Sequence, residues 1–103
     1  MNTLAIEPRT TFAENVRVTS ESLCVELSDG RNVTAPLAWF PRLQHGTAKE
    51  RNNWRLIGRG EGIHWPDLDE DISVEGLMRG EPSGESQQSF QRWLEKRGKS
   101  GKE

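Results

Sequence analysis

The chain has 103 residues, of which 32% are hydrophobic and 29% charged, so it is long enough for one domain with a small core. Fourteen basic residues against sixteen acidic ones give a formal net charge of −2, which argues against a generic nucleic-acid binder. No stretch approaches the ~20 apolar residues of a membrane helix, the first residues do not form a secretory signal, and a single cysteine, Cys24, excludes an internal disulfide. We therefore expect a soluble cytoplasmic protein.

Residues 15–35 alternate between apolar and polar side chains, which is the spacing of β-strands. Turns are expected at Ser20-Glu21 and at Asp29-Gly30, where glycine supplies a positive φ without a steric clash. The pattern predicts a three-stranded antiparallel meander. One of its faces is apolar and needs a cover; it carries Leu23, Val25, Leu27 and Val33.

Short helices and strands are expected in the middle of the chain. Pro36 ends the third strand, and we expect one turn of helix ending at Phe40, because Pro41 disfavours a longer one. Thr47 and Glu50 have the spacing of a capping box, which predicts a helix over about residues 47–53. A strand-like run over residues 54–57, a glycine-rich loop over 58–62 and a short strand over 63–65 follow.

The last third of the chain reads as two helices joined by a linker over residues 80–86. The acidic run 67–71 is expected to form the first turn of a short helix over Val74–Met78, capped by Ser73 or Asp71 and ending at Gly80. A second helix, over about 86–97, has a frayed end at 98–101; its apolar stripe is Phe90, Trp93 and Leu94, and Arg97 continues the same helical spacing. The whole pattern predicts an α+β fold, with a small domain over residues 12–80 and an amphipathic helical appendage over 81–103.

Two patterns resemble ligand-binding motifs but lack residues that those motifs require. The glycines at 58, 60 and 62 lack the third glycine of a dinucleotide fingerprint and the terminal lysine of a P-loop, so a turn is expected and no cofactor. The aspartates at 67, 69 and 71 have the spacing of a calcium loop, but its glycine and glutamate positions hold Ile72 and Met78. His64 lies nearby, but one histidine with flexible carboxylates is only a weak signal of a metal site, so no metal is expected.

Nothing in the sequence marks a catalytic nucleophile. Cys24 lies mid-strand with no activating neighbour, and no G-x-S-x-G elbow is present. We expect no enzyme; the alternative is an acid–base site that pairs His64 with Asp67 or Asp69, with a perturbed pKa there.

Five segments of the chain resemble, in order, the bacterial domain-of-unknown-function family 2442. They are Leu-Ser-Asp-Gly-Arg at 27–31, Pro-Leu-Ala-Trp-Phe-Pro-Arg-Leu at 36–43, Arg-Asn-Asn-Trp-Arg-Leu-Ile-Gly at 51–58, Gly-Ile-His-Trp-Pro-Asp-Leu-Asp-Glu-Asp-Ile-Ser at 62–73 and Gly-Leu-Met-Arg-Gly at 76–80. The resemblance implies a small α+β domain and a bacterial protein encoded beside a second small protein, with an antitoxin-like role. Some relatives carry a C-terminal helix-turn-helix, for which residues 81–103 supply only one helix.

Two functions remain open from the sequence. In the first, the chain is a protein-interaction module, antitoxin-like, that masks a small partner protein. The residues expected to bind the partner are Phe90, Trp93 and Leu94 of the last helix and Asp67, Asp69 and Asp71 of the acidic run. In the second, it is a nucleic-acid-associated transcriptional regulator, using Arg42, Arg51, Arg55 and Arg59.

Overall fold

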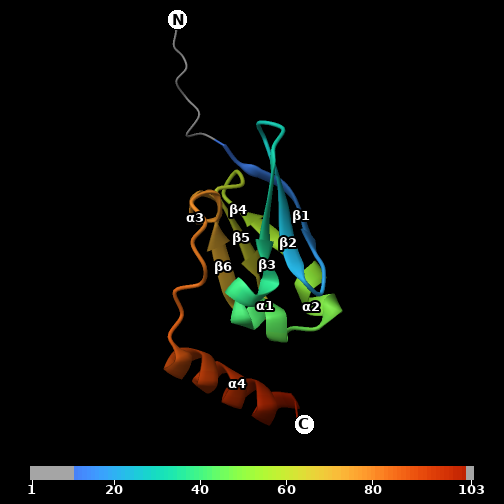
Figure 1. The fold of residues 1–103 in the computed structure, drawn as a ribbon. Coiled ribbons are helices and arrows are strands. Elements are labelled where there is room, and N and C mark those ends of the chain that lie inside the picture. Colours follow the sequence, from blue (N-terminus) through green and yellow to red (C-terminus); the bar gives the residue numbers. More distant parts are fainter. Residues whose placement is uncertain (1–10, 102–103) are drawn as a thin grey trace, which may run out of the picture.

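A computed structural model describes residues 11–101, with side chains as far as Gly98. The fold is α+β, with two three-stranded antiparallel sheets, short helices and a C-terminal helix. Figure 1 shows the two sheets as layers, with the short helices of residues 37–52 at one end and the last helix running beneath them.

The first sheet is the meander that the alternation predicts. Strands β1 (Ala13–Val18), β2 (Ser22–Leu27) and β3 (Asn32–Pro36) pair in the order β1-β2-β3. Its inner face buries Leu23, Val25 and Leu27, and Val33 is half-buried beside Val25. The predicted apolar face is therefore confirmed as the face that packs inward.

The connection between the sheets contains one more helix than expected. Leu37–Trp39 form the expected single turn, but a further helix, α1 (Pro41–His45), begins at Pro41. Proline was expected to stop helix formation here; at the first helical position its missing N–H is not needed, so it begins a helix instead. The capping box at Thr47 and Glu50 is confirmed at the start of α2 (Ala48–Asn52).

The second sheet contains a strand that the sequence analysis missed. Strands β4 (Arg55–Ile57), β5 (Gly62–Trp65) and β6 (Glu70–Ser73) pair in that order. The acidic run 67–71 thus forms the β5–β6 turn and the start of β6, and the expectation that it forms the first turn of a helix is wrong. The reason is that Ile72 pairs with Ile63 and is buried, which extends the sheet by one strand.

The expected helix over Val74–Met78 is confirmed as α3, and Ser73 rather than Asp71 caps it. The last helix, α4 (Gln87–Gly101), is longer than expected, because the helix runs through residues 98–101. No helix in the described part of the chain, residues 11–101, is long and apolar enough to cross a membrane.

A core of aliphatic and aromatic side chains fills the space between the sheets and the short helices. Trp65 is fully buried, and its indole N–H donates to the carbonyl of Arg51 at 3.0 Å, so its polar atom is satisfied. The largest other fully buried side chains are Leu23, Leu37, Leu43, Ile63 and Leu68.

The turn between β4 and β5 joins the two sheets. The amide of Ala13 in β1 donates to the carbonyl of Gly60 at 2.8 Å, and Gly60 has a φ of +110°. A Cβ at Gly60 would lie 2.4 Å from the Ala13 carbonyl oxygen, so only glycine fits this contact. The glycine-rich segment 58–62 thus has a structural role in the fold.

Candidate functional site

Helix α4 packs against its own domain through the aromatic stripe that the sequence predicts. The rings of Phe90 and Trp93 stack with centroids 5.7 Å apart, and the edge of His45 in α1 meets both, at 6.5 and 5.8 Å. Trp93 is half-buried and packs on the core, and Phe90 and Leu94 are half-buried too. The helix that could have been left free for a partner is therefore docked.

Arg42 of α1 is the centre of this contact. Its guanidinium forms a forked ion pair with Glu85, with Nε 2.9 Å from Oε1, and lies 5.1 Å from the centre of the Trp93 ring. Only 14% of the Arg42 side chain and 12% of the Glu85 side chain are exposed. Hydrogen bonds from Arg42 hold the pKa of Glu85 below its ordinary value.

The same guanidinium holds the turn between β5 and β6. Its Nη1 donates to the backbone carbonyls of Leu68 and Asp69, at 3.3 and 3.0 Å. Because Arg42 bonds to both the turn and Glu85, it fixes the position of α4 relative to the acidic turn.

A second ion pair holds the far end of α4. Arg97 donates to Glu50 of α2 at 2.7 and 3.1 Å, and its guanidinium lies 4.9 Å from the centre of the Trp93 ring. Glu50 also accepts from the backbone amide of Thr47 in the capping box. These bonds, above all those from Arg97, lower the pKa of Glu50 to about 2.

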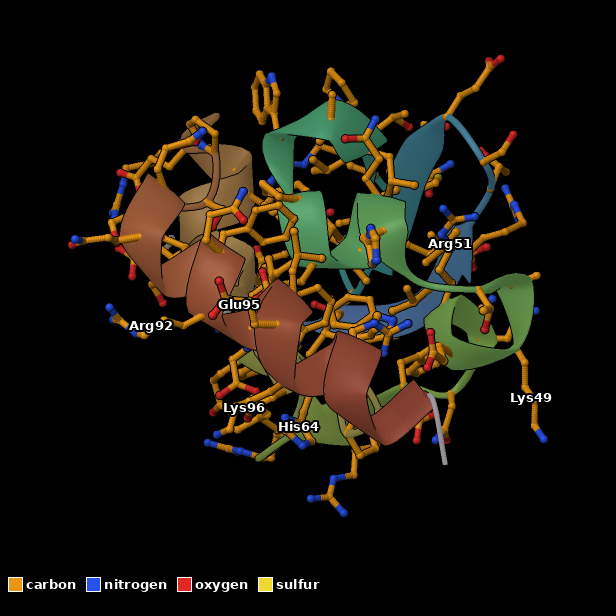
Figure 2. All side chains as sticks on the ribbon, turned by 90° about the horizontal axis from the view of Figure 1, so that it is seen from below. Lys49, Arg51, His64, Arg92, Glu95 and Lys96 are labelled. Carbon is orange, nitrogen blue, oxygen red and sulfur yellow. The ribbon has the colours of Figure 1, made fainter. Side chains whose placement is uncertain are left out.

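Between α4 and the acidic turn lies an open cleft of about 400 Å³. It brings together two sets of residues that the sequence analysis named separately, because Trp93 and Asp69 both line it. Its other lining residues are Arg42, Ser89, Arg92, Glu95 and Lys96. Figure 2 shows Arg92 and Lys96 extending from one side of α4, with Lys49 and Arg51 on the other side of the molecule.

The three aspartates of the acidic run sit in different settings. Asp69 is in the left-handed region, with a φ of +52°, and 88% of its side chain is exposed. Asp67 accepts from Asn53 at 2.9 Å, and Asp71 lies 2.5 Å from Nδ1 of His64. Only Asp69 therefore lines the cleft with its carboxylate in solvent.

Glu70, beside Asp69, faces inward. Burial raises the pKa of Glu70 to about 7; Arg42 opposes this rise, and the carboxylates of Glu85, Asp71 and Asp69 add to it. The group lines a small cavity of about 200 Å³ beneath the 81–84 segment that leads to α4.

The four arginines of the nucleic-acid hypothesis do not share one setting. Arg42 is engaged with Glu85, and Arg51 donates to the carbonyls of Leu43 and Gln44 at the end of α1. Arg59 is in the β4–β5 turn, and its guanidinium lies 5.4 Å from the centre of the Phe12 ring. Arg55 is exposed on β4. Phosphate contacts would therefore have to come from Arg55 and Arg59 rather than from all four.

Cys24 and His64, the residues considered for catalysis, lie in different sheets. Cys24 lies on the outer face of the first sheet, between Arg17 and Thr34. His64 pairs with Asp71 rather than with Asp67 or Asp69. Across residues 11–98, no three His, Cys, Asp or Glu side chains gather as a metal ion would need.

Comparison with known proteins defines the family. The model of the family described as "Protein of unknown function (DUF2442)" matches residues 13–83, and the chain belongs to this family. The match spans both sheets and α3 and ends before Glu85 and α4. The resemblance read from the sequence is thus confirmed.

Two solved structures share this fold. A protein of unknown function from Rhodospirillum rubrum is 27% identical, with a TM-score of 0.64, over 73% of this chain and 93% of its own. An uncharacterised protein from Chromobacterium violaceum is 19% identical, with a TM-score of 0.62, over 71% of this chain and 69% of its own. No curated protein matches the chain.

Proposed function

We propose that this chain is a protein-interaction module with an antitoxin-like role, and that it binds a small partner protein at the cleft between α4 and the β5–β6 turn. The observation that supports this most is the double role of Arg42. It bonds to Glu85 before α4 and to the carbonyls of Leu68 and Asp69, so an aromatic wall and an exposed carboxylate are held side by side.

We propose that the partner segment presents a cation to the carboxylate of Asp69, in a cleft whose lining also holds Arg42, Arg92 and Lys96. The Asp69 carboxylate is exposed and lies 3.7 Å from Nη1 of Arg42, which also bonds to the Asp69 carbonyl, so little backbone entropy is lost when a further cation binds there. Trp93 supplies an apolar surface beside it. A small protein that binds RNA or DNA through a basic face would be masked by such a contact.

The first test is co-purification from the native host, with the full chain as bait at low and high salt. We expect one small protein to be retained by the wild-type chain at high salt and to be lost with Asp69→Asn, since asparagine tolerates the left-handed backbone but carries no charge. Glu14→Gln is the matched control, because it also removes one negative charge. Glu14 is exposed on β1 and does not line the cleft.

The proposal fails if Asp69→Asn and Glu14→Gln retain the same protein equally well. It also fails if only nucleic acid is recovered and washes off steeply with salt. That second result would favour the regulator hypothesis, since phosphate binding weakens linearly with the logarithm of salt concentration.

A further inference from the structure

The outer face of the second sheet exposes side chains on its two edge strands and carries an ordered pattern, with His64 half-buried and Gly62 buried on the central strand. Cross-strand pairing places Arg55, His64 and Asp71 in one row across β4, β5 and β6. The next row is Ile57, Gly62 and Ser73. Residues directly opposite each other share a face, and the inner face is the one that buries Ile63, Trp65 and Ile72.

The two charges at the ends of the first row are not paired with each other. Arg55 has no hydrogen bond or ion pair to any residue that the structure describes, and Asp71 uses one oxygen for His64 and is 68% exposed. Two strand spacings, about 9.5 Å, separate the strands that carry them, and His64 lies between. Within one chain, therefore, the row has opposite charges at its two edges that do not pair with each other.

The second row has an apolar side chain at one edge, glycine at its centre and the polar Ser73 at the other edge. Ile57 is 41% exposed, and its side chain leans over Gly62, with Cδ1 3.2 Å from where a Cβ would stand. Ile57 and Met78 are the exposed large hydrophobic side chains of the described residues. The Ile57 side chain thus covers the buried Gly62 and gives the centre of this row an apolar surface.

We propose that this face binds a second copy of the chain, sheet against sheet, about a two-fold axis that runs parallel to β5. This rotation places β4 of one copy opposite β6 of the other. Each residue keeps its position along the strand direction. Arg55 then lies opposite Asp71 of the second copy, twice, and the two Ile57 side chains meet over the paired Gly62 positions. The face is self-complementary, as an isologous interface must be.

This interface is separate from the candidate site. None of the six residues of the two rows lines the cleft between α4 and the β5–β6 turn. Dimerisation and partner binding are thus independent proposals that can fail separately.

Charge reversal tests the geometry directly. In Arg55→Glu, both pairs between the two copies place Glu opposite Asp. In Asp71→Lys, both pairs place Arg opposite Lys. Each single variant is therefore expected to dimerise about tenfold more weakly than the wild type. An equimolar mixture of the two variants restores opposite charges in both pairs, and so does the double variant. Sedimentation equilibrium over a range of concentrations measures the dimerisation of the two single variants, their mixture and the double variant. Circular dichroism confirms that each variant folds.

Lys49→Glu is the matched control, since it reverses one exposed charge on α2 and should leave the association unchanged. The expected result is concentration-dependent dimerisation of the wild type, its weakening in each single variant and its return in the mixture. The proposal is overturned if the wild type stays monomeric up to millimolar concentration. It is equally overturned if the folded variants mix without forming a heterodimer.

Discussion

At the scale of single residues, two side chains close to the β5–β6 turn have opposite electrostatic settings. Arg42 is almost fully engaged by Glu85 and by two backbone carbonyls, so its charge is compensated. Glu70 is half-buried, has no hydrogen bond to a described residue, and lies among other carboxylates. The turn is thus held by one cation and weakened by one carboxylate that is costly to ionise.

The pKa of Glu70 predicts a pH-dependent loss of stability. Because burial raises this pKa to about 7, the folded state keeps the proton that the unfolded state loses near pH 4.5. The contribution of protonated Glu70 is complete below pH 4.5 and is lost as the pH rises through 7. Glu70→Gln should therefore raise the free energy of unfolding by about 1–3 kcal/mol at pH 8 and change it little at pH 4.5.

Urea denaturation of both proteins at pH 4.5, 6 and 8 measures this difference, with Glu14→Gln as a control that should follow the wild type. An equal effect of Glu70→Gln at every pH would contradict a raised pKa and point to packing instead.

At the scale of elements, the short helix α2 connects local capping to the docking of α4. Glu50 accepts from the Thr47 amide at 2.9 Å and from Arg97 in α4, so one carboxylate serves both helices. The Thr47 hydroxyl accepts in turn from the Glu50 amide at 3.1 Å. Capping of a five-residue helix therefore also positions the side chain that holds α4.

This arrangement predicts unequal effects of two neighbouring substitutions. Thr47→Ala removes one cap and should lower the free energy of unfolding by about 1 kcal/mol. Glu50→Gln weakens both the cap and the ion pair with Arg97, so it should cost more than Thr47→Ala at pH 7. Thr47→Ser keeps the hydroxyl and is the matched control; equal losses for Thr47→Ala and Thr47→Ser in urea denaturation would rule out the cap as the cause.

At the scale of the whole molecule, the two-sheet domain and α4 differ in how they are held. Every fully buried hydrophobic residue of the described chain lies between Ala13 and Leu77. The segment from Glu85 through α4 adds half-buried aromatic rings and two ion pairs at the surface of this domain. The family match ends at residue 83, at the same boundary.

The domain is therefore expected to fold without α4. Deleting residues 85–103 should leave a cooperative unfolding transition and the circular dichroism of a sheet protein. We expect the free energy of unfolding to fall by about 2–4 kcal/mol, since two ion pairs and the contact of Trp93 are lost. A truncated chain that is unfolded at 25 °C would show instead that α4 belongs to the folding unit.

The same division of scales explains which features could be predicted. The meander, the capping box and α3 were all predicted correctly, because each depends on residues a few positions apart. Strand β6 was missed because a four-residue strand with acidic residues resembles a capped helix start, and α1 was missed because Pro41 was weighed as a helix breaker alone.

The sequence by itself determined most of the local elements, the family and the apolar stripe of the last helix, since periodicity and capping act between near neighbours. Only the tertiary structure decided where that stripe packs and that Arg42 joins Glu85 to the β5–β6 turn, because these contacts connect residues 43 and 26 positions apart. It also decided that Arg55 and Asp71 end one row on an open face. Strand pairing, which no local pattern specifies, puts them there.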